Sequence, residues 1–333
     1  GLDWDKPVPE EKWPLVVKYC ENDVRTTEPV FDDRAQDFVA RKILADLSGL
    51  SVNDTTARHT AKILFGDNRR PQEEFIYTDL SEMFPGYEYK LGKSTYKGEL
   101  VGEGGLVRGK PGMYTNVAVL DVASMHPTSI EQLEYFGPYT KNYVALMKAR
   151  LAIKDGDYET ARKMFDGKLA PYLKNEEDAE KLSFALKIVI NIVYGLTAAK
   201  FDNPFRDKRN KDNIVAKRGA LFMVDLMEAV EAQGFQVIHT KTDSIKIPDA
   251  TKEIIEFVME FGDKYGYTFE HEATYEKFCL VNDAVYVAKT LPGRKPAYWE
   301  TTGAQFQHPF VKKTLFTKEA LMFNDLCETK NVT

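Results

Sequence analysis

Apolar residues follow two different spacings along the chain, and the two alternate. From residue 16 to 65 the spacing is helical, with Val39, Ile43 and Leu47 on one face of a predicted helix. From residue 90 to 127 glycines and β-branched residues indicate short strands, and the last of these contains the apolar run 117–120. The sequence therefore predicts a helical lead-in followed by the beginning of a sheet.

Helices interrupt this sheet before its strands resume. Helical spacing covers 142–154 and 179–200, a shorter helix reaches about residue 165, and a proline-containing loop separates the two longer helices. The remaining elements in chain order are a helix after Ile214, a strand pair around Lys241, a helix over 252–265 and strands near Glu270 and over 281–288. This order predicts an α+β fold in which a helical hairpin projects from a sheet.

The composition is that of a globular protein: 333 residues, 43% of them hydrophobic and 29% charged. We find no apolar run near the roughly 20 residues needed to cross a bilayer and no secretory signal pattern, which favours a cytoplasmic protein with no membrane partner. Cys20, Cys279 and Cys327 form no CxxC pair, so we expect buried or inert thiols. The chain opens with Gly1 and reads as a piece of a longer protein.

A net charge of -6 hides a basic segment. Between residues 187 and 218, eight lysines and arginines stand against three aspartates. Such a segment would suit a phosphate backbone, and a solvated loop is the alternative interpretation.

Two aspartates stand where predicted strands end. Asp121 closes the run 117–120, and Asp243 follows the segment 235–240 and a short turn at Lys241 and Thr242. Carboxylates from distant segments, brought side by side, can hold a pair of divalent cations for phosphoryl transfer. For either residue alone, the alternative is a solvated turn position.

Three short segments give these aspartates a context. Residues 121–128 read D-V-A-S-M-H-P-T and resemble motif A of family B DNA polymerases, D-x-x-S-L-Y-P-S. Residues 187–195 read K-I-V-I-N-I-V-Y-G and resemble motif B, K-x-x-x-N-S-x-Y-G, and residues 241–244 read K-T-D-S where motif C has D-T-D-S. All three occur in the family's order, so the chain resembles the palm and fingers of this family.

The resemblance implies a fold and a domain order. A palm, an antiparallel sheet backed by helices, would take residues 66–140 and 214–290, with helical-hairpin fingers inserted at 141–213. Residues 1–65 would be a helical lead-in and a C-terminal remnant of a 3′–5′ exonuclease domain, because Tyr19 and Asp23 match that domain's third motif. Residues 291–333 would begin a truncated thumb. The compact spacing of motifs A and B is similar to that of bacteriophage polymerases.

The family's activity is template-directed addition of dNTPs to a primer 3′-hydroxyl, with release of pyrophosphate. The resemblance implies that Asp121, Val122 and Asp243 bind two Mg²⁺, for which Mn²⁺ can substitute. It makes primer–template DNA and dNTPs the partners, together with replisome accessory proteins.

The turn after the motif A aspartate can present backbone N–H groups around Ser124 and Met125 to nucleotide phosphates. Arg150 and Lys154 fall at i and i+4 of one predicted helix, where they can meet the triphosphate, and exposed helix cations are the alternative. The nucleotide-binding residues that the resemblance implies are Ser124, Met125, His126, Arg150, Lys154, Lys187 and Asn191.

Four residues match contacts that the family makes with DNA. Tyr194 lies at i+7 from Lys187 on the helical face that also carries Asn191, where both would abut the nascent base pair, and Gly195 ends motif B. Lys241 would meet the backbone at the primer end. Tyr286 falls where the family has a K-x-Y motif, but the lysine is missing.

The chain departs from the family pattern at three positions. His126 takes the place of a tyrosine that excludes a 2′-hydroxyl, Lys241 replaces the first aspartate of motif C, and Ile192 replaces a serine. These departures motivate an alternative, a catalytically degenerate nucleic-acid-binding palm with a structural replication role. A reverse transcriptase or viral RNA polymerase is disfavoured because Ser244, not a second aspartate, follows Asp243.

Overall fold

A computed structural model describes residues 5–102, 104–293 and 296–326, and the chain divides into two compact units. Unit 1 comprises Gly1–Arg69 and Lys141–Val193, and unit 2 comprises Arg70–Thr140 and Tyr194–Thr333. Gly1 and Cys327 lie outside the described residues. Of the other two cysteines, Cys20 is exposed and Cys279 is half-buried, and both are free thiols.

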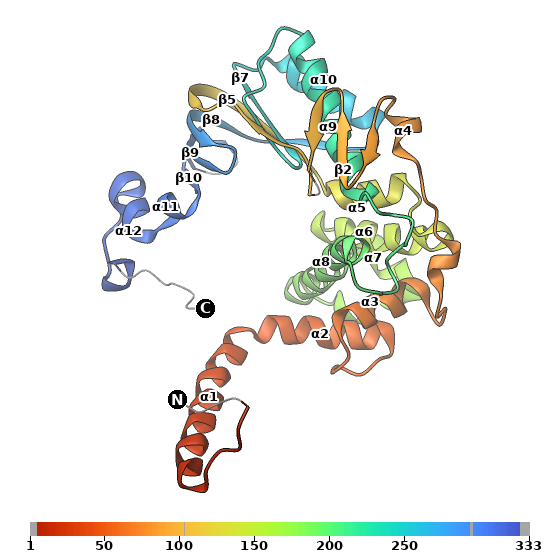
Figure 1. The fold of residues 1–333 in the computed structure, drawn as a ribbon, viewed down its shortest axis with the longest axis vertical. Coiled ribbons are helices and arrows are strands. Elements are labelled where there is room, and N and C mark those ends of the chain that lie inside the picture. The colour runs from red at the N-terminus through yellow and green to blue at the C-terminus, as the bar shows by residue number, and fades with distance from the viewer. Residues whose placement is uncertain (1–4, 103, 294–295, 327–333) are drawn as a thin grey trace. The chain divides into compact units, whose positions relative to one another are not determined.

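Unit 1 is built from helices (Figure 1). They are α1 (Trp13–Asp33), α2 (Ala35–Ser48), α3 (Thr56–Phe65), α6 (Thr140–Lys154), α7 (Tyr158–Lys163) and α8 (Glu176–Ala198). The predicted helical lead-in and both helices of the predicted hairpin are therefore present. In α2 the buried face is Ala40, Ile43, Leu44 and Ser48, which has helical spacing. Of the predicted face only Ile43 is buried, because the helix turns Val39 and Leu47 to the half-buried margin.

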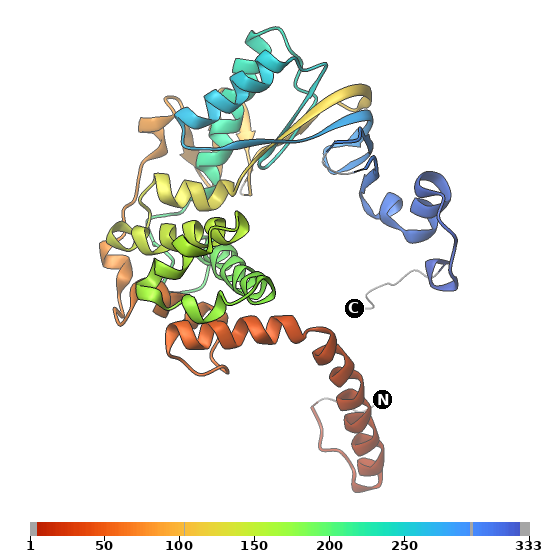
Figure 2. The same ribbon diagram turned by 180° about the vertical axis from the view of Figure 1, so that it is seen from behind.

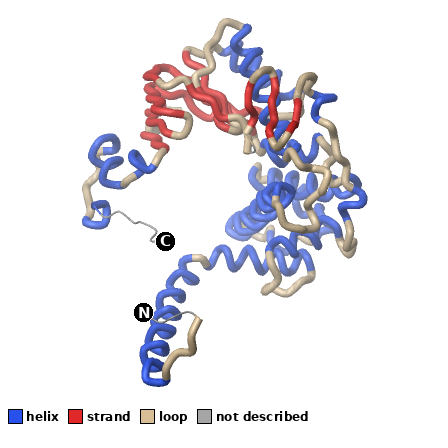
Figure 3. Tube along the Cα trace, viewed as in Figure 1, coloured by secondary structure: helices blue, strands red, loops and turns tan. Residues whose placement is uncertain are grey.

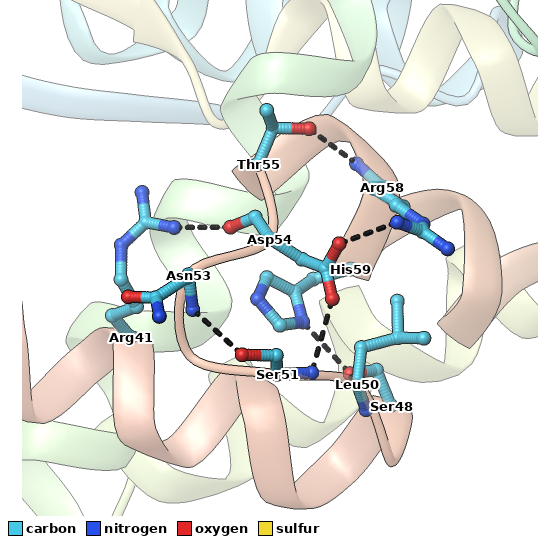
Figure 4. Close-up of polar contacts among 9 residues, drawn as sticks. All are labelled: Arg41, Ser48, Leu50, Ser51, Asn53, Asp54, Thr55, Arg58 and His59. Atoms are coloured by element: carbon cyan, nitrogen blue, oxygen red, sulfur yellow. Dashed lines mark hydrogen bonds and ion pairs between the residues drawn. The ribbon is translucent and has the colours of Figure 1, made fainter.

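The turn between α2 and α3 is held by side chains (Figure 4). Asp54 accepts hydrogen bonds from the Ser51 N–H at 3.0 Å and from Arg58 Nη1 at 2.6 Å. The buried His59 ring lies 2.8 Å through Nδ1 from Ser48 Oγ, which joins the end of α2 to α3. Thr55 caps α3 by accepting from the Arg58 N–H.

Helix α8 bears on the expectation that no segment of the chain is long and apolar enough to cross a bilayer. It is long and apolar enough to cross a bilayer, the one such helix in the described part of the chain. By length and composition alone this is weak evidence, since the core helix of a soluble protein passes the same test. In its apolar window 39% is buried, and Leu182, Ala185 and Val189 are completely buried.

Unit 2 contains every strand of the described residues (Figure 3). A seven-stranded sheet has the order β10-β9-β8-β5-β7-β6-β4, and each neighbouring pair is antiparallel. Its strands are β4 (Val107–Gly109), β5 (Gly112–Val122), β6 (His239–Lys241), β7 (Ser244–Pro248), β8 (Phe269–Asn282), β9 (Val285–Thr290) and β10 (Trp299–Thr302). A second, three-stranded sheet contains β1 (Glu88–Lys90), β2 (Lys93–Tyr96) and β3 (Glu99–Val101).

Helices back the larger sheet. α9 (Ile214–Ala232) packs against α10 (Lys252–Lys264) and α5 (Met125–Gln132), and the first two lie side by side in both views (Figure 2). Gly219 lets α9 and α5 approach, because an added Cβ would stand 2.5 Å from Met125 Sδ. The short helices α4 (Leu80–Met83), α11 (Ala304–Gln307) and α12 (Pro309–Lys312) complete the unit. The α+β class is confirmed, with a mixed fold around an antiparallel sheet.

Three predicted strand boundaries were wrong. The turn expected at Lys241 and Thr242 consists of Thr242 and Asp243, because Lys241 pairs with Ser244 as the last residue of β6. The segment 235–240 forms a strand only from His239, because the positive φ of 86° at Gly234 ends α9 in a turn that delays pairing. The predicted strand over 281–288 is instead the hairpin between β8 and β9, with Asp283 and Ala284 in its turn. Asn282 Oδ1 accepts from the Ala284 N–H, a side-chain turn that the apolar pattern does not reveal.

Candidate active site

Strand pairing brings the two sequence-distant aspartates together. Asp121, next to the last residue of β5, lies opposite Ser244, the first residue of β7. Asp243 precedes that serine in the two-residue turn between β6 and β7. The Val122 N–H donates a 2.8 Å hydrogen bond to the Asp243 carbonyl, which joins the two carboxylate-bearing segments directly.

The turn that carries Asp243 is braced by Gly105 and Leu106. Thr242 has a positive φ of 57°, and its N–H donates to the Leu106 carbonyl at 2.8 Å. Gly105 lies against this threonine, because an added Cβ would stand 3.2 Å from Thr242 Cγ2. With φ at 134°, Gly105 adopts backbone that side chains disfavour. A residue with a side chain at this position would therefore press on the turn.

Burial and mutual charge perturb the carboxyl groups. Burial raises the pKa of Asp121 to about 7, and the charge of Asp243, followed by that of Glu272, adds to the rise. Burial also raises the pKa of Asp243. Two half-buried carboxylates that repel each other form a region of negative potential, which a cation would relieve.

The donor chemistry fits a hard divalent cation. Mg²⁺ prefers oxygen ligands and is commonly bound by one or two carboxylates together with substrate phosphates. Asp121 and Asp243 supply two carboxylates, and Val122 follows Asp121 and bonds through its N–H to the Asp243 carbonyl. Among the described residues no group of three or more His, Cys, Asp or Glu side chains is arranged to hold a metal ion. A metal here would therefore depend on substrate oxygens for part of its ligand shell.

Sequence reasoning missed a buried lysine beside the carboxylates. Lys246 on β7 is 3% exposed, and its ammonium lies 3.3 Å from Ser244 Oγ and 5.4 Å from the centre of the Tyr286 ring. Burial lowers its pKa, while the charges of Glu300 and Asp121 oppose that shift. The available signal was a charged residue in the otherwise apolar strand 244–248.

A bulge in β8 lies next to Asp121. The register with β5 passes from Val119 opposite Ala273 to Leu120 opposite His271, so Glu272 is the extra residue. Bulges bend a strand and re-aim side chains, and they are common beside active sites. Here the bulge places Glu270 opposite Asp121 and adds a further acidic side chain to the edge that carries the two aspartates.

Motifs A and B meet in unit 2 through two rings. His126 of α5 stacks on Tyr194 with ring centroids 3.9 Å apart and an angle of 15°. Burial lowers the pKa of His126 to about 4, so the ring is neutral near pH 7. Ser124 is exposed at the N-terminus of α5 with a φ of 60°, and Met125 is buried against α9.

The remaining predicted DNA-binding residues occupy different environments. Lys241 is exposed at the end of β6, and Gly195 is exposed with open space around its Cα. Tyr286 is 8% exposed within the apolar cluster of the sheet, and its hydroxyl donates to Glu300. Burial raises the pKa of Tyr286 to about 12.

Three predicted triphosphate-binding cations line one cavity of unit 1. Together with Glu176 and Glu180, these cations surround a volume of ≈ 380 Å³: Arg150 and Lys154 of α6 and Lys187 of α8. Arg150 Nε is buried without a hydrogen-bond partner in the described part of the chain. Asn191, one turn beyond Lys187, is exposed. The cavity thus offers three cationic side chains, one with an unused donor.

No family model and no curated protein matches the chain. Among solved structures, it is similar to the family B DNA polymerase from the hyperthermophilic archaeon Pyrobaculum calidifontis, with a TM-score of 0.48 and 17% sequence identity. The likeness covers 92% of this chain and 41% of that chain, so this chain spans less than half the length of that polymerase. So distant a likeness carries no weight for function, which has to be inferred from the motifs and the site.

Proposed function

We propose that the chain comprises the palm and fingers of a template-directed DNA polymerase of family B type. The observation that carries the proposal is the pairing of β5 with β7, which sets Asp121 beside the turn of Asp243. The motif resemblance alone identifies two aspartates that are far apart in the sequence, and it gives no contact between them. Their convergence at one sheet edge supplies the geometry that two-metal phosphoryl transfer needs.

The proposed metal ligands are Asp121, Val122 and Asp243. Bound there, two Mg²⁺ or Mn²⁺ would activate the primer 3′-hydroxyl and stabilise the pyrophosphate leaving group. The chain's own contribution is to hold the two carboxyl groups close together at one sheet edge. The buried positive charge of Lys246 opposes the rise in the pKa of both aspartates that burial causes.

The nucleotide contacts follow from the same resemblance. Arg150, Lys154 and Lys187 would bind the triphosphate and neutralise charge that develops during in-line attack. The stacked ring of His126 would limit space beside the sugar, and Asn191 would abut the base pair. Tyr194, Gly195, Lys241 and Tyr286 would contact primer–template DNA.

The wider assignment is also a proposal. In a bacteriophage-like polymerase, residues 1–65 would include a remnant of the exonuclease domain and residues 291–333 would begin the thumb. Tyr19 and Asp23 lie exposed on α1, and within the described ranges they belong to no group of His, Cys, Asp or Glu side chains that could hold a metal ion. Replisome accessory proteins would be further partners, and the protein would act in the cytoplasm.

A degenerate palm that only binds nucleic acid is the alternative. Lys241 favours it, because a cation stands where the family's motif C has a carboxylate. The two functions differ in one observable, the metal-dependent incorporation of nucleotides.

The test is extension of a labelled primer on a DNA template by this chain and by the longer protein. We expect the longer protein to add the dNTP that complements the template when Mg²⁺ is present and to add none in EDTA. DNA binding without incorporation in Mg²⁺ or Mn²⁺ would favour the degenerate palm and refute the polymerase.

A further inference from the structure

Unit 2 contains a second charged cavity, which shares no residue with the aspartate site. It measures ≈ 390 Å³ and is lined by the β1–β2 hairpin, the end of α8, the loop 199–213 and the start of α9. We call it the cationic cavity. Its charged residues are Lys200, Arg206, Lys208, Lys211, Lys217 and one acid, Asp212. Five of the eight cations in the basic segment 187–218 therefore line this one cavity.

The cations of this cavity are arranged by the fold. Lys217 is 2% exposed, and its ammonium donates to the carbonyls of Val101, at 2.8 Å, and Gly102. Arg206 donates to the Lys200 carbonyl. Lys208 and Lys211 are exposed, and the ion pair of Lys208 with Asp202 joins two highly exposed side chains, which gives little neutralisation. Like charges gathered in a hollow repel one another, so an anionic ligand would be favoured.

Helix α9 adds to the positive potential. It has 19 residues and begins at Ile214, directly after the cavity residue Asn213. The aligned peptide dipoles of a helix place partial positive charge at its N-terminus. Together with the lysines, this end of α9 favours phosphate.

Two further side chains indicate more than a phosphate ion. The Tyr89 ring lines the cavity, and its hydroxyl donates to the Lys211 carbonyl at 3.1 Å. Asp212 is 6% exposed, and its Oδ2 accepts from the Tyr87 hydroxyl at 2.9 Å. Asp212 Oδ1 has no hydrogen bond of ordinary geometry in the described part of the chain, although the Tyr77 hydroxyl interacts with the same carboxylate. The cavity thus combines cations, an aromatic face and a buried acceptor.

We propose that the cationic cavity binds one nucleotide unit of a single-stranded nucleic acid. The exposed Lys208 and Lys211 meet the phosphates. The base stacks on Tyr89, and a ring N–H of the base donates to Asp212 Oδ1. Aromatic platforms beside a basic groove are the general means of binding single strands. The inference deepens the proposed function, on which it rests for the identity of the strand as template.

The test measures binding of a labelled oligothymidylate of about 12 nucleotides to the full-length protein in EDTA and without dNTPs. A failure of catalysis therefore cannot be mistaken for a failure of this site. Lys208→Gln with Lys211→Gln removes two charges from the cavity, and Lys252→Gln with Lys264→Gln removes two from α10 as the matched control. At about 0.1 M salt the loss of two single-strand phosphate contacts corresponds to about 25-fold weaker binding and a salt slope smaller by about 1.4.

Each outcome decides the proposal. The expected result is that large loss in the cavity variant and binding within about two-fold of wild type in the control. An equal loss of strand binding in both variants would mean that the lysines attract the strand non-specifically, and it would overturn the proposal. Tyr89→Leu should weaken strand binding by about five-fold or more, and Tyr89→Phe should retain it. Strand binding that survives Tyr89→Leu, or that pyrophosphate or thymidine monophosphate displaces as readily as unlabelled strand, would identify a free-phosphate site instead.

Discussion

Gly105→Ala should disturb the candidate active site through the backbone. The added methyl would stand 3.2 Å from Thr242 Cγ2 and 3.3 Å from Thr242 Cα, and the φ of 134° would be strained for alanine. Backbone strain of this kind costs about 1–3 kcal/mol. The free energy of unfolding should therefore fall by about that amount.

The same change should reduce catalysis, because Thr242 precedes Asp243. Relief of the contact requires a shift of a few tenths of an ångström. If a misplacement of about 1 Å costs about 100-fold in rate, such a shift costs about 2- to 10-fold. Urea denaturation and single-turnover primer extension would measure the two effects.

Gly104→Ala is the matched control for this prediction. An added Cβ at Gly104 meets nothing within 4 Å, and its φ lies outside the left-handed region. If the two variants differ by less than about 0.5 kcal/mol in stability and extend primers equally, Gly105 does not position the turn of Asp243 and this reasoning fails.

Three further predictions concern the site itself. Asp121 binds a proton in the folded, metal-free protein up to about pH 7, whereas the unfolded chain loses this proton near pH 4. The free energy of unfolding in EDTA should therefore fall as pH rises between these values. The urea midpoint of Asp121→Asn minus that of wild type should grow from about pH 5 to pH 8, and a constant difference would contradict the burial argument. His126→Gly removes the ring stacked on Tyr194 and should raise incorporation of rNTPs relative to dNTPs by about ten-fold; unchanged sugar selectivity would show that His126 does not limit the space beside the sugar. Lys187→Gln should raise the KM for dNTP, whereas Lys168→Gln, which alters a lysine that does not line that cavity, should not; equal effects would separate the cavity from nucleotide binding.

Helices and the strand of motif A could be predicted from local pattern. Apolar spacing indicated α6, α9 and α10 because each buries one stripe or most of its surface on neighbouring elements. The apolar run before Asp121 indicated β5 because its residues 117–120 are buried on both faces of the sheet. In these segments the element that the local apolar pattern predicts is also the element that packing against neighbouring helices and strands favours.

Other features depended on contacts between distant residues. The β8–β9 hairpin was missed because Asn282 makes its turn with a side chain, inside a segment rich in strand-forming residues. Lys246 reads as an exposed strand residue until pairing with β5 buries it opposite Val119. In the sequence the cationic cavity appears only as a run of charged residues. Its lining cannot be predicted from that run, because Tyr89 of β1 and Lys217 of α9 are far apart along the chain.

The most direct measurement is single-turnover primer extension by the full-length protein carrying Asp243→Asn, beside the control Asp263→Asn. The first change keeps the shape of the β6–β7 turn but removes a proposed metal-ligand charge, and the second removes an equal charge from exposed α10. We expect extension to fall by about 1,000-fold or more only in Asp243→Asn, with DNA binding retained in both. Extension at the wild-type rate by Asp243→Asn would contradict the assignment of Asp121 and Asp243 as the catalytic pair.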